Sequence, residues 1–212
     1  MKDSYHFEVK KKRPEELFDK VSDYFKGDIL KNYARSKSMM HIQEKITIRS
    51  LELLDLKSKN GLILDAGCGP GFTSTYLKEI GYDVVALDII SEFLSFYNIN
   101  ELNPIAADMC FLTFQPNTFD AIISISALQW IFRDKINDLM KLKLIHLSKD
   151  IENTLKPNAK AIFQFYPKNN SIMEAIGKII TENTKLKGTY IIDNPNNAKK
   201  RKIFLLLEKE CN

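Results

Sequence analysis

The chain has 212 residues, of which 44% are hydrophobic and 27% charged, with a formal net charge of +4. This length fits one domain with a sizeable core, and the composition excludes a disordered chain. No apolar run reaches the roughly 20 residues of a membrane-spanning helix, and the start lacks the apolar stretch of a signal peptide. The three scattered cysteines form no CxxC pair and predict neither a disulfide framework nor a metal site. We therefore expect one domain over residues 1–212, without a membrane partner, in the cytoplasm or, in a eukaryotic host, the nucleus.

Helical patterns dominate the first sixty residues. Residues 1–14 are polar and basic, which predicts a flexible arm. Helices are expected near Glu15–Phe25 and near Ser38–Leu54, where apolar residues recur at spacings of three, four and seven. Lys57–Gly61 is typical of a turn.

From Leu62 onward, short apolar runs alternate with helical segments. Strands are expected at Leu62–Ala66, Asp83–Leu87, Pro104–Ala107, Ala121–Ile125 and Ala159–Tyr166. Helices are expected at Thr73–Ile80, Ser91–Tyr97 and about Asp134–Leu155. Continuous apolar strands separated by helices predict a doubly wound, mostly parallel α/β sheet.

The end of the chain has a different pattern. Thr189–Ile192 and Ile203–Leu207 are predicted strands joined by the segment DNPNNAKKRK, which has no helical pattern. Two strands joined in this way are most simply antiparallel.

A glycine-rich segment, ILDAGCGPGF, lies between the first predicted strand and a helix. A dinucleotide fingerprint would need a third glycine at position 72, and a P-loop would need Lys-Ser or Lys-Thr there, but the residue is Phe72. The pattern acid-x-Gly-x-Gly-x-Gly fits fully, with Asp65 followed by glycines at 67, 69 and 71. Two further acids, Asp88 and Asp108, are expected to end the second and third strands, where ligands of open α/β sheets bind.

These motifs resemble those of class I S-adenosylmethionine-dependent methyltransferases. The resemblance implies a Rossmann-like, seven-stranded sheet with a C-terminal antiparallel hairpin and S-adenosylmethionine as cofactor. The resemblance further implies that Asp88 accepts hydrogen bonds from the ribose hydroxyls of the cofactor and that Asp108 contacts its adenine amino group. The expected cofactor-binding residues are Asp65, Ala66, Gly67, Cys68, Gly69, Gly71, Asp88, Ile89, Asp108, Met109 and Ser124.

Further strings narrow the resemblance to one methyltransferase family. They are RPEEL (13–17), the helix segment 42–54, ISISALQW (123–130), FQFYPKN (163–169) and the hairpin with DNPN and KK. Together, in this order, they are similar to the small-subunit ribosomal RNA guanine N7 methyltransferases. The resemblance implies that helices within residues 15–60 close over the cofactor. One departure is Ser38, where family members carry Arg.

Three residues after the fourth and fifth strands are the candidates for substrate positioning. Gln129, Trp130 and Tyr166 would hold a guanine base beside the methyl group, by stacking or by hydrogen bonds. No general base is expected, because guanine N7 has a free lone pair. An alternative role for Trp130 is simple core packing.

Two other functions remain open from the sequence. Carboxyl O-methyltransferases that act on small molecules or carrier proteins share a similar A-L-Q-W string, and a non-catalytic ribosome-assembly factor could retain this fold. The basic runs Lys10–Arg13 and Lys199–Lys202 are either contacts for RNA phosphates or solvated charges.

The resemblance also implies a protein partner. The third strand of this fold lies at a sheet edge, and Pro104–Met109 and the residues that follow are mostly apolar. Enzymes of the family rely on a small zinc-binding activator protein that adds a strand there. The alternative is that local loops cover this edge.

Overall fold

A computed structural model of the chain describes residues 7–56, 60–98, 102, 104–132 and 136–211. The helices are α1 (Pro14–Leu17), α2 (Val21–Tyr24), α3 (Gly27–Ala34), α4 (Lys37–Leu54), α5 (Phe72–Glu79), α6 (Ser91–Leu94), α7 (Asp138–Thr154) and α8 (Asn170–Asn183), with a 3-10 turn at Leu128–Trp130. The strands are β1 (Leu62–Ala66), β2 (Asp83–Asp88), β3 (Ile105–Ala106), β4 (Phe119–Ile125), β5 (Leu155–Phe165), β6 (Lys187–Asp193) and β7 (Lys202–Glu208).

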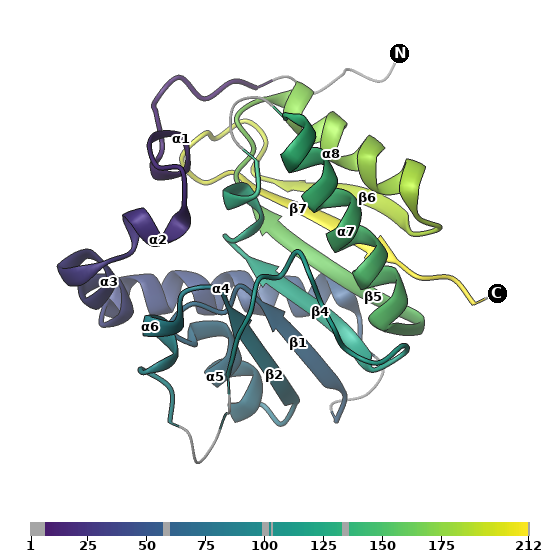
Figure 1. The fold of residues 1–212 in the computed structure, drawn as a ribbon, viewed down its shortest axis with the longest axis horizontal. Helices are drawn as coiled ribbons and strands as arrows, with labels where there is room; N and C mark the ends of the chain where they lie inside the picture. Colours follow the sequence, from purple (N-terminus) through teal and green to yellow (C-terminus); the bar gives the residue numbers. More distant parts are fainter. Residues whose placement is uncertain (1–6, 57–59, 99–101, 103, 133–135, 212) are drawn as a thin grey trace.

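All seven strands join one sheet, in the order β3-β2-β1-β4-β5-β7-β6 (Figure 1). The first five strands in this order are parallel, and β7 lies antiparallel between β5 and β6. This arrangement confirms the predicted α/β fold with its C-terminal antiparallel hairpin.

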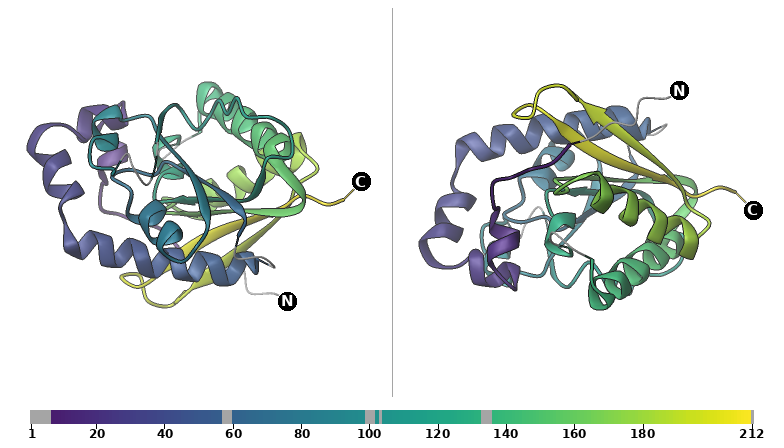
Figure 2. Two further views of the ribbon diagram at one scale, coloured as in Figure 1. Left: turned by 90° about the horizontal axis from the view of Figure 1, so that it is seen from below. Right: turned by 90° about the horizontal axis from the view of Figure 1, so that it is seen from above.

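Helices cover both faces of the sheet. Figure 2 shows α4 on one side and α7 and α8 on the other. Leu54 of α4 and Leu77 of α5 pack with Ile63 of β1 on the first side. On the second side, Leu144 of α7 and Ile176 of α8 join the larger part of the core. Because both faces are buried, the central strands are mostly apolar, as the sequences LILDA of β1 and FDAIISI of β4 show.

The strand register brings the loops that matter to one edge. Asp65 of β1 is paired with Ala86 of β2 and with Ile123 of β4. The strands are parallel, so the loops that follow β1, β2 and β4 leave the sheet at the same edge. Ligands of open α/β sheets bind at this edge.

The N-terminal part differs from the prediction. The helix expected over Glu15–Phe25 is divided into α1 and α2, because the chain is extended at Phe18 and again at Lys20. A further helix, α3, was not predicted. Of the expected flexible arm, residues 1–6 lie outside the described residues, but Val9 donates a backbone hydrogen bond to Lys168.

Two further differences concern secondary structure later in the chain. Helix α8 was not predicted, although Asn169 caps its first turn by accepting a hydrogen bond from the Ile172 amide. Strand β3 has only two residues, shorter than the predicted Pro104–Ala107. Most of the expected turn at Lys57–Gly61 lies outside the described residues.

Among the described helices, none is long and apolar enough to cross a membrane.

Candidate functional site

A cavity of about 390 Å³ lies at the carboxyl edge of β1, β2 and β4. Its lining includes Asp65, Gly67, Cys68, Gly69, Asp88, Ile89, Asp108 and Met109, all predicted as site residues. Other lining residues were not predicted, among them Asp19, Lys20, Val21, Ser22, Phe25, Tyr33, Gln43, Thr73, Phe93, Ser126, Ala127, Ile131 and Lys143. The cavity is in the size range of small-molecule sites.

The glycine loop after β1 owes its shape to backbone conformations that favour glycine. Gly67, Gly69 and Gly71 have φ angles of 80°, 53° and 95°. A Cβ atom on Gly67 would lie 2.4 Å from the Cβ of Ala127, whereas one on Gly69 would meet no atom within 4 Å. The loop is therefore tightly packed at its first glycine and open at its second.

Asp88 fixes this loop from the end of β2. Its carboxylate accepts hydrogen bonds from the backbone amides of Gly69 and Ile90, both at 2.8 Å. Burial raises the pKa of Asp88, while these hydrogen bonds lower it. Each carboxylate oxygen accepts one of these bonds, which leaves lone pairs for a ligand.

Asp65 lies deeper in the same wall. Its carboxylate accepts a hydrogen bond from the Ser74 hydroxyl at 2.5 Å, and Ser74 is 3.3 Å from the Tyr97 hydroxyl. Burial raises the pKa of Asp65 to about 7, and the charge of Asp88 acts in the same direction. Hydrogen bonds from a ligand, or a positive charge on it, would favour the ionised form of both acids.

Asp108 was predicted to end the third strand, but β3 already stops at Ala106. Instead, Asp108 accepts a hydrogen bond from the backbone amide of Cys110 and so stabilises the turn after the strand. The ammonium group of Lys143 lies 3.5 Å from its carboxylate. Both side chains line the cavity, so the positive charge of Lys143 lies beside the negative charge of Asp108 there.

Five predicted residues do not line the cavity. They are Ala66, Gly71, Ser124, Gln129 and Tyr166. The side chains of β4 alternate between faces, and Ile125 rather than Ser124 lines the cavity. Gln129 is buried and donates a hydrogen bond to the Ser126 carbonyl, while its own side-chain oxygen has no partner among the described residues.

Trp130 does line the cavity and lies in an aromatic cluster with the N-terminal segment. Its ring centroid is 5.8 Å from that of Tyr24 and 5.8 Å from that of Phe25. Phe25 also packs on Tyr33 and Phe93. The N-terminal helices therefore cover the cavity through aromatic contacts. These contacts join residues far apart in the sequence, so the spacing of residues within the short helices does not predict them.

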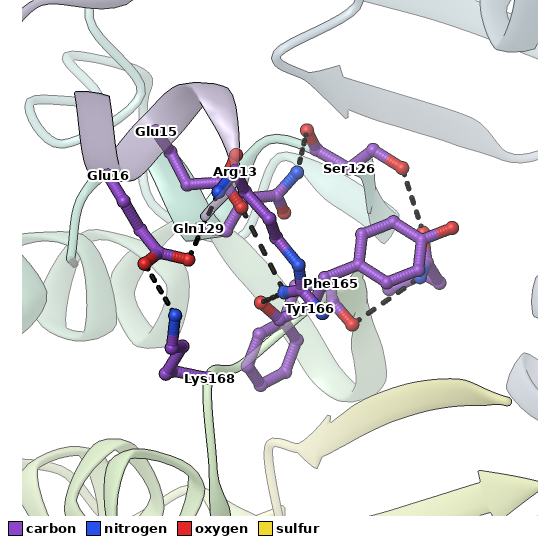
Figure 3. Close-up of polar contacts among 9 residues, drawn as sticks. Arg13, Glu15, Glu16, Ser126, Gln129, Phe165, Tyr166 and Lys168 are labelled. Carbon is purple, nitrogen blue, oxygen red and sulfur yellow. Dashed lines mark hydrogen bonds and ion pairs between the residues drawn. The ribbon is translucent and has the colours of Figure 1, made fainter. Parts of the chain in front are cut away.

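A second set of contacts holds α1 to the segment after β5 (Figure 3). Arg13 donates a hydrogen bond to the backbone carbonyl of Tyr166. Lys168 forms an ion pair with Glu16, and both side chains are mostly buried, with exposed fractions of 16% and 11%. Burial raises the pKa of the neighbouring Glu15 carboxyl. The motifs RPEEL and FQFYPKN, far apart in the sequence, thus meet here.

Tyr166 has cations on its ring rather than a place in the cavity. The guanidinium of Arg13 is 5.6 Å from the ring centroid, and the ammonium of Lys202 is 5.5 Å away. These distances are typical of cation–π interactions. Tyr166 therefore joins the N-terminal segment to the start of β7.

Comparisons with known proteins find related methyltransferases. A family model for a methyltransferase domain matches residues 64–163. The chain is 34% identical over 189 residues to the 18S rRNA (guanine-N(7))-methyltransferase of Bos taurus, covering 87% of this chain and 67% of that protein. It is 35% identical over 191 residues to the 18S rRNA (guanine(1575)-N(7))-methyltransferase of Saccharomyces cerevisiae, covering 86% and 67%.

Solved structures show the same fold at low sequence identity. The magnesium protoporphyrin IX methyltransferase of Synechocystis, solved with bound S-adenosylmethionine, has a TM-score of 0.66 and 18% identity, covering 95% of this chain and 100% of that one. A TehB-like S-adenosylmethionine-dependent methyltransferase from Corynebacterium glutamicum has a TM-score of 0.63 and 16% identity, covering 85% and 98%.

Proposed function

We propose that this chain, which belongs to the 18S rRNA (guanine-N7)-methyltransferase family, methylates N7 of a guanine in small-subunit ribosomal RNA. The chain spans about two thirds of the length of these relatives. The observation that carries the proposal is the convergence of Asp65, Gly69, Asp88 and Trp130 on one cavity. Acids and a glycine loop would hold the cofactor there, and an aromatic ring would face the base.

The cavity fits S-adenosylmethionine, the cofactor of this class of enzyme. Its volume of about 390 Å³ suits a ligand of this size. The open side of Gly69 leaves the loop free to approach a ligand. Asp65 and Asp88 are both buried, which raises the pKa of each carboxyl, and a cationic, hydrogen-bonding ligand would stabilise their charged forms.

Each acid has a distinct role in this proposal. Asp88 would accept hydrogen bonds from the ribose hydroxyls, and Asp108 from the adenine amino group. Asp65 would support the end of the cofactor that carries the ammonium group. Ile89, which is exposed and lines the cavity, would offer an apolar surface to the adenine.

The bound cofactor supplies a methyl group on a sulfonium, which is a good leaving group. The protein must therefore align the guanine and exclude water, and no proton has to be removed from N7. Trp130 would stack on the base, while Tyr24 and Phe25 fix the orientation of the Trp130 ring. Gln129 donates a hydrogen bond to the Ser126 carbonyl and would stabilise the turn that carries Trp130, rather than contact the base.

The decisive experiment measures methyl transfer from labelled S-adenosylmethionine. We expect the full chain to label small-subunit ribosomal RNA and not malonyl-acyl-carrier protein, with the label at guanine N7 detected by aniline-induced strand cleavage. Labelling of the carrier protein alone would establish the carboxyl O-methyltransferase alternative. No transfer to either substrate, with intact cofactor binding, would favour the assembly factor.

Replacement of Trp130 tests the substrate side of the cavity. We expect Trp130→Ala to reduce methyl transfer at least about tenfold, as stacking on one base is worth about 1–3 kcal/mol. Trp130→Phe should retain most of the activity, and both variants should bind S-adenosylmethionine normally by calorimetry. An unchanged transfer rate together with a lower melting temperature would show that Trp130 only packs the core.

We further propose that a small zinc-binding activator protein adds a strand beside β3. The position of β3 at the sheet edge and the exposure of Ile105 support this docking site. Co-expression with the activator should raise the soluble yield and protect the amides of Ile105 and Ala106 from hydrogen exchange. A monomeric chain that is fully active alone would contradict the proposal.

A further inference from the structure

Three segments that are distant in sequence converge at the carboxyl edge of β5. Residues 7–13 run along the segment after β5, through a β-bridge between Glu8 and Asn169. The loop between β6 and β7 reaches the same place, where the guanidinium of Arg201 lies 5.0 Å from the ring centroid of Phe7. Figures 1 and 2 both show the N-terminal segment next to this loop. Two basic runs of the sequence are thereby brought together.

The cations of this region have two kinds of environment. Arg13 and Lys168 are occupied by the Tyr166 carbonyl and by Glu16, and Arg201 donates hydrogen bonds to the Pro195 carbonyl. Five lysines, by contrast, are exposed and form no ion pair with any described residue. They are Lys10, Lys11, Lys12, Lys199 and Lys200, and together they are called the basic surface below.

Acidic side chains nearby do little to neutralise this surface. Glu16 is paired with Lys168, and Asp193 at the end of β6 is paired with Arg49. Glu8 is the one carboxylate in residues 7–13, and it is exposed. The positive charge of the five lysines therefore faces solvent.

The basic surface lies at the same edge of the sheet as the cavity. Phe165, the last residue of β5, is paired with Ile203 near the start of β7. The loop with Lys199 and Lys200 therefore leaves the sheet at the carboxyl edge of β5, and β5 neighbours β4, whose following turn carries Trp130. The turn with Trp130 and the loop with Lys199 and Lys200 therefore leave the sheet at the same edge.

We propose that the basic surface binds the phosphates of a single-stranded RNA segment that flanks the target guanine. The inference rests on the proposed function and adds the path of the RNA backbone. Arg13, Lys168 and Arg201 hold the surface in shape, and the exposed lysines contact the phosphates. Such contacts position the RNA without reading its sequence.

The test compares lysine-to-glutamine variants of the full chain. We expect K199Q/K200Q and K10Q/K11Q/K12Q each to weaken binding of a small-subunit ribosomal RNA transcript at least about fivefold near 0.1 M salt. The slope of log K against log salt should fall by about 0.7 for each phosphate that no longer has a lysine beside it. Calorimetric binding of S-adenosylmethionine should stay unchanged, because none of the five lysines lines the cavity.

A matched control uses lysines at the opposite edge. Lys149 near the end of α7 and Lys185 just before β6 are exposed, and K149Q/K185Q removes the same charge as K199Q/K200Q. This control should leave both the affinity for RNA and the salt slope unchanged.

The outcomes separate the two proposals. Wild-type protein that methylates the RNA, with equal losses in K199Q/K200Q and K149Q/K185Q, would overturn the RNA path and leave the proposed function intact. A wild-type protein that neither binds nor methylates the transcript would instead contradict the proposed function. Loss of binding to anionic phospholipid vesicles, with RNA binding intact, would assign the basic surface to a membrane and overturn the inference.

Discussion

The glycine loop with its acids and the N-terminal cover of the cavity are built on different principles. The loop after β1 is shaped by its own backbone, since Gly67 has a φ of 80° and Gly69 is held by the Asp88 carboxylate. The cover, residues 14–34, consists of three short helices whose places depend on side chains elsewhere. Glu16 is held by its ion pair with Lys168, and Phe25 is held by its ring contact with Trp130.

This difference has a consequence for how each region tolerates change. A backbone-defined loop fails when one glycine gains a side chain, whereas a cover held by several separate contacts weakens in steps. We therefore expect the largest single effects in the loop and smaller, coupled effects in the cover.

The strongest contrast is expected within the loop itself. Gly67→Ala should lower the free energy of unfolding by about 2–4 kcal/mol, because strain at positive φ adds to the 2.4 Å approach to Ala127. Gly69→Ala should lower the free energy of unfolding by only about 1 kcal/mol, from strain at positive φ. The same substitution should also weaken S-adenosylmethionine binding, because the added Cβ atom would occupy the open side of the loop. Chemical denaturation and calorimetry measure the two quantities, and equal destabilisation by both variants would refute the contrast.

The next effect concerns the acid at the end of β2. Asp88→Ala should weaken S-adenosylmethionine binding by about 1–3 kcal/mol, because charge-assisted hydrogen bonds are removed. Asp83→Ala at the exposed start of the same strand is the control and should bind the cofactor normally. Unchanged affinity in a folded Asp88→Ala variant would remove this residue from the cofactor site.

The sequence predicted the loop region well because its information is local. The pattern from Asp65 to Gly71 requires no distant partner, and the apolar run Leu62–Ala66 coincides with β1. Helix α8 was missed although its signal is also local, since Asn169 and the apolar residues 172, 173, 176, 179 and 180 have helical spacing. These local signals are sufficient to predict a helix over this segment.

The N-terminal cover could not be predicted in the same way. Helices α1 and α2 have four residues each, too few for a periodic pattern, and their positions follow from Arg13 and Phe25 contacting residues far along the chain. Tyr166 illustrates the same limit. Its place after β5 predicted a position beside the substrate, but the side chain does not line the cavity and has two cations near its ring.

The smallest effect is expected in the cover. In a double-mutant cycle of Glu16→Gln and Lys168→Met, we expect a coupling of about 1 kcal/mol, because both side chains are mostly buried. The exposed pair Lys178 and Glu182 on α8 is the control, with an expected coupling of about 0.3 kcal/mol. Additive losses in the first cycle would show that the ion pair does not hold α1 in place.

The position of β7 affects the order in which the molecule can fold during synthesis. Strand β7 follows β6 in the chain but lies between β5 and β6 in the sheet. Until Lys202–Glu208 leaves the ribosome, β5 exposes an unpaired edge and β6 has no neighbour in the sheet. Such an intermediate is prone to aggregation, since open strand edges pair with other chains. The late arrival of β7 thus makes the nascent chain most vulnerable just before its sheet is complete.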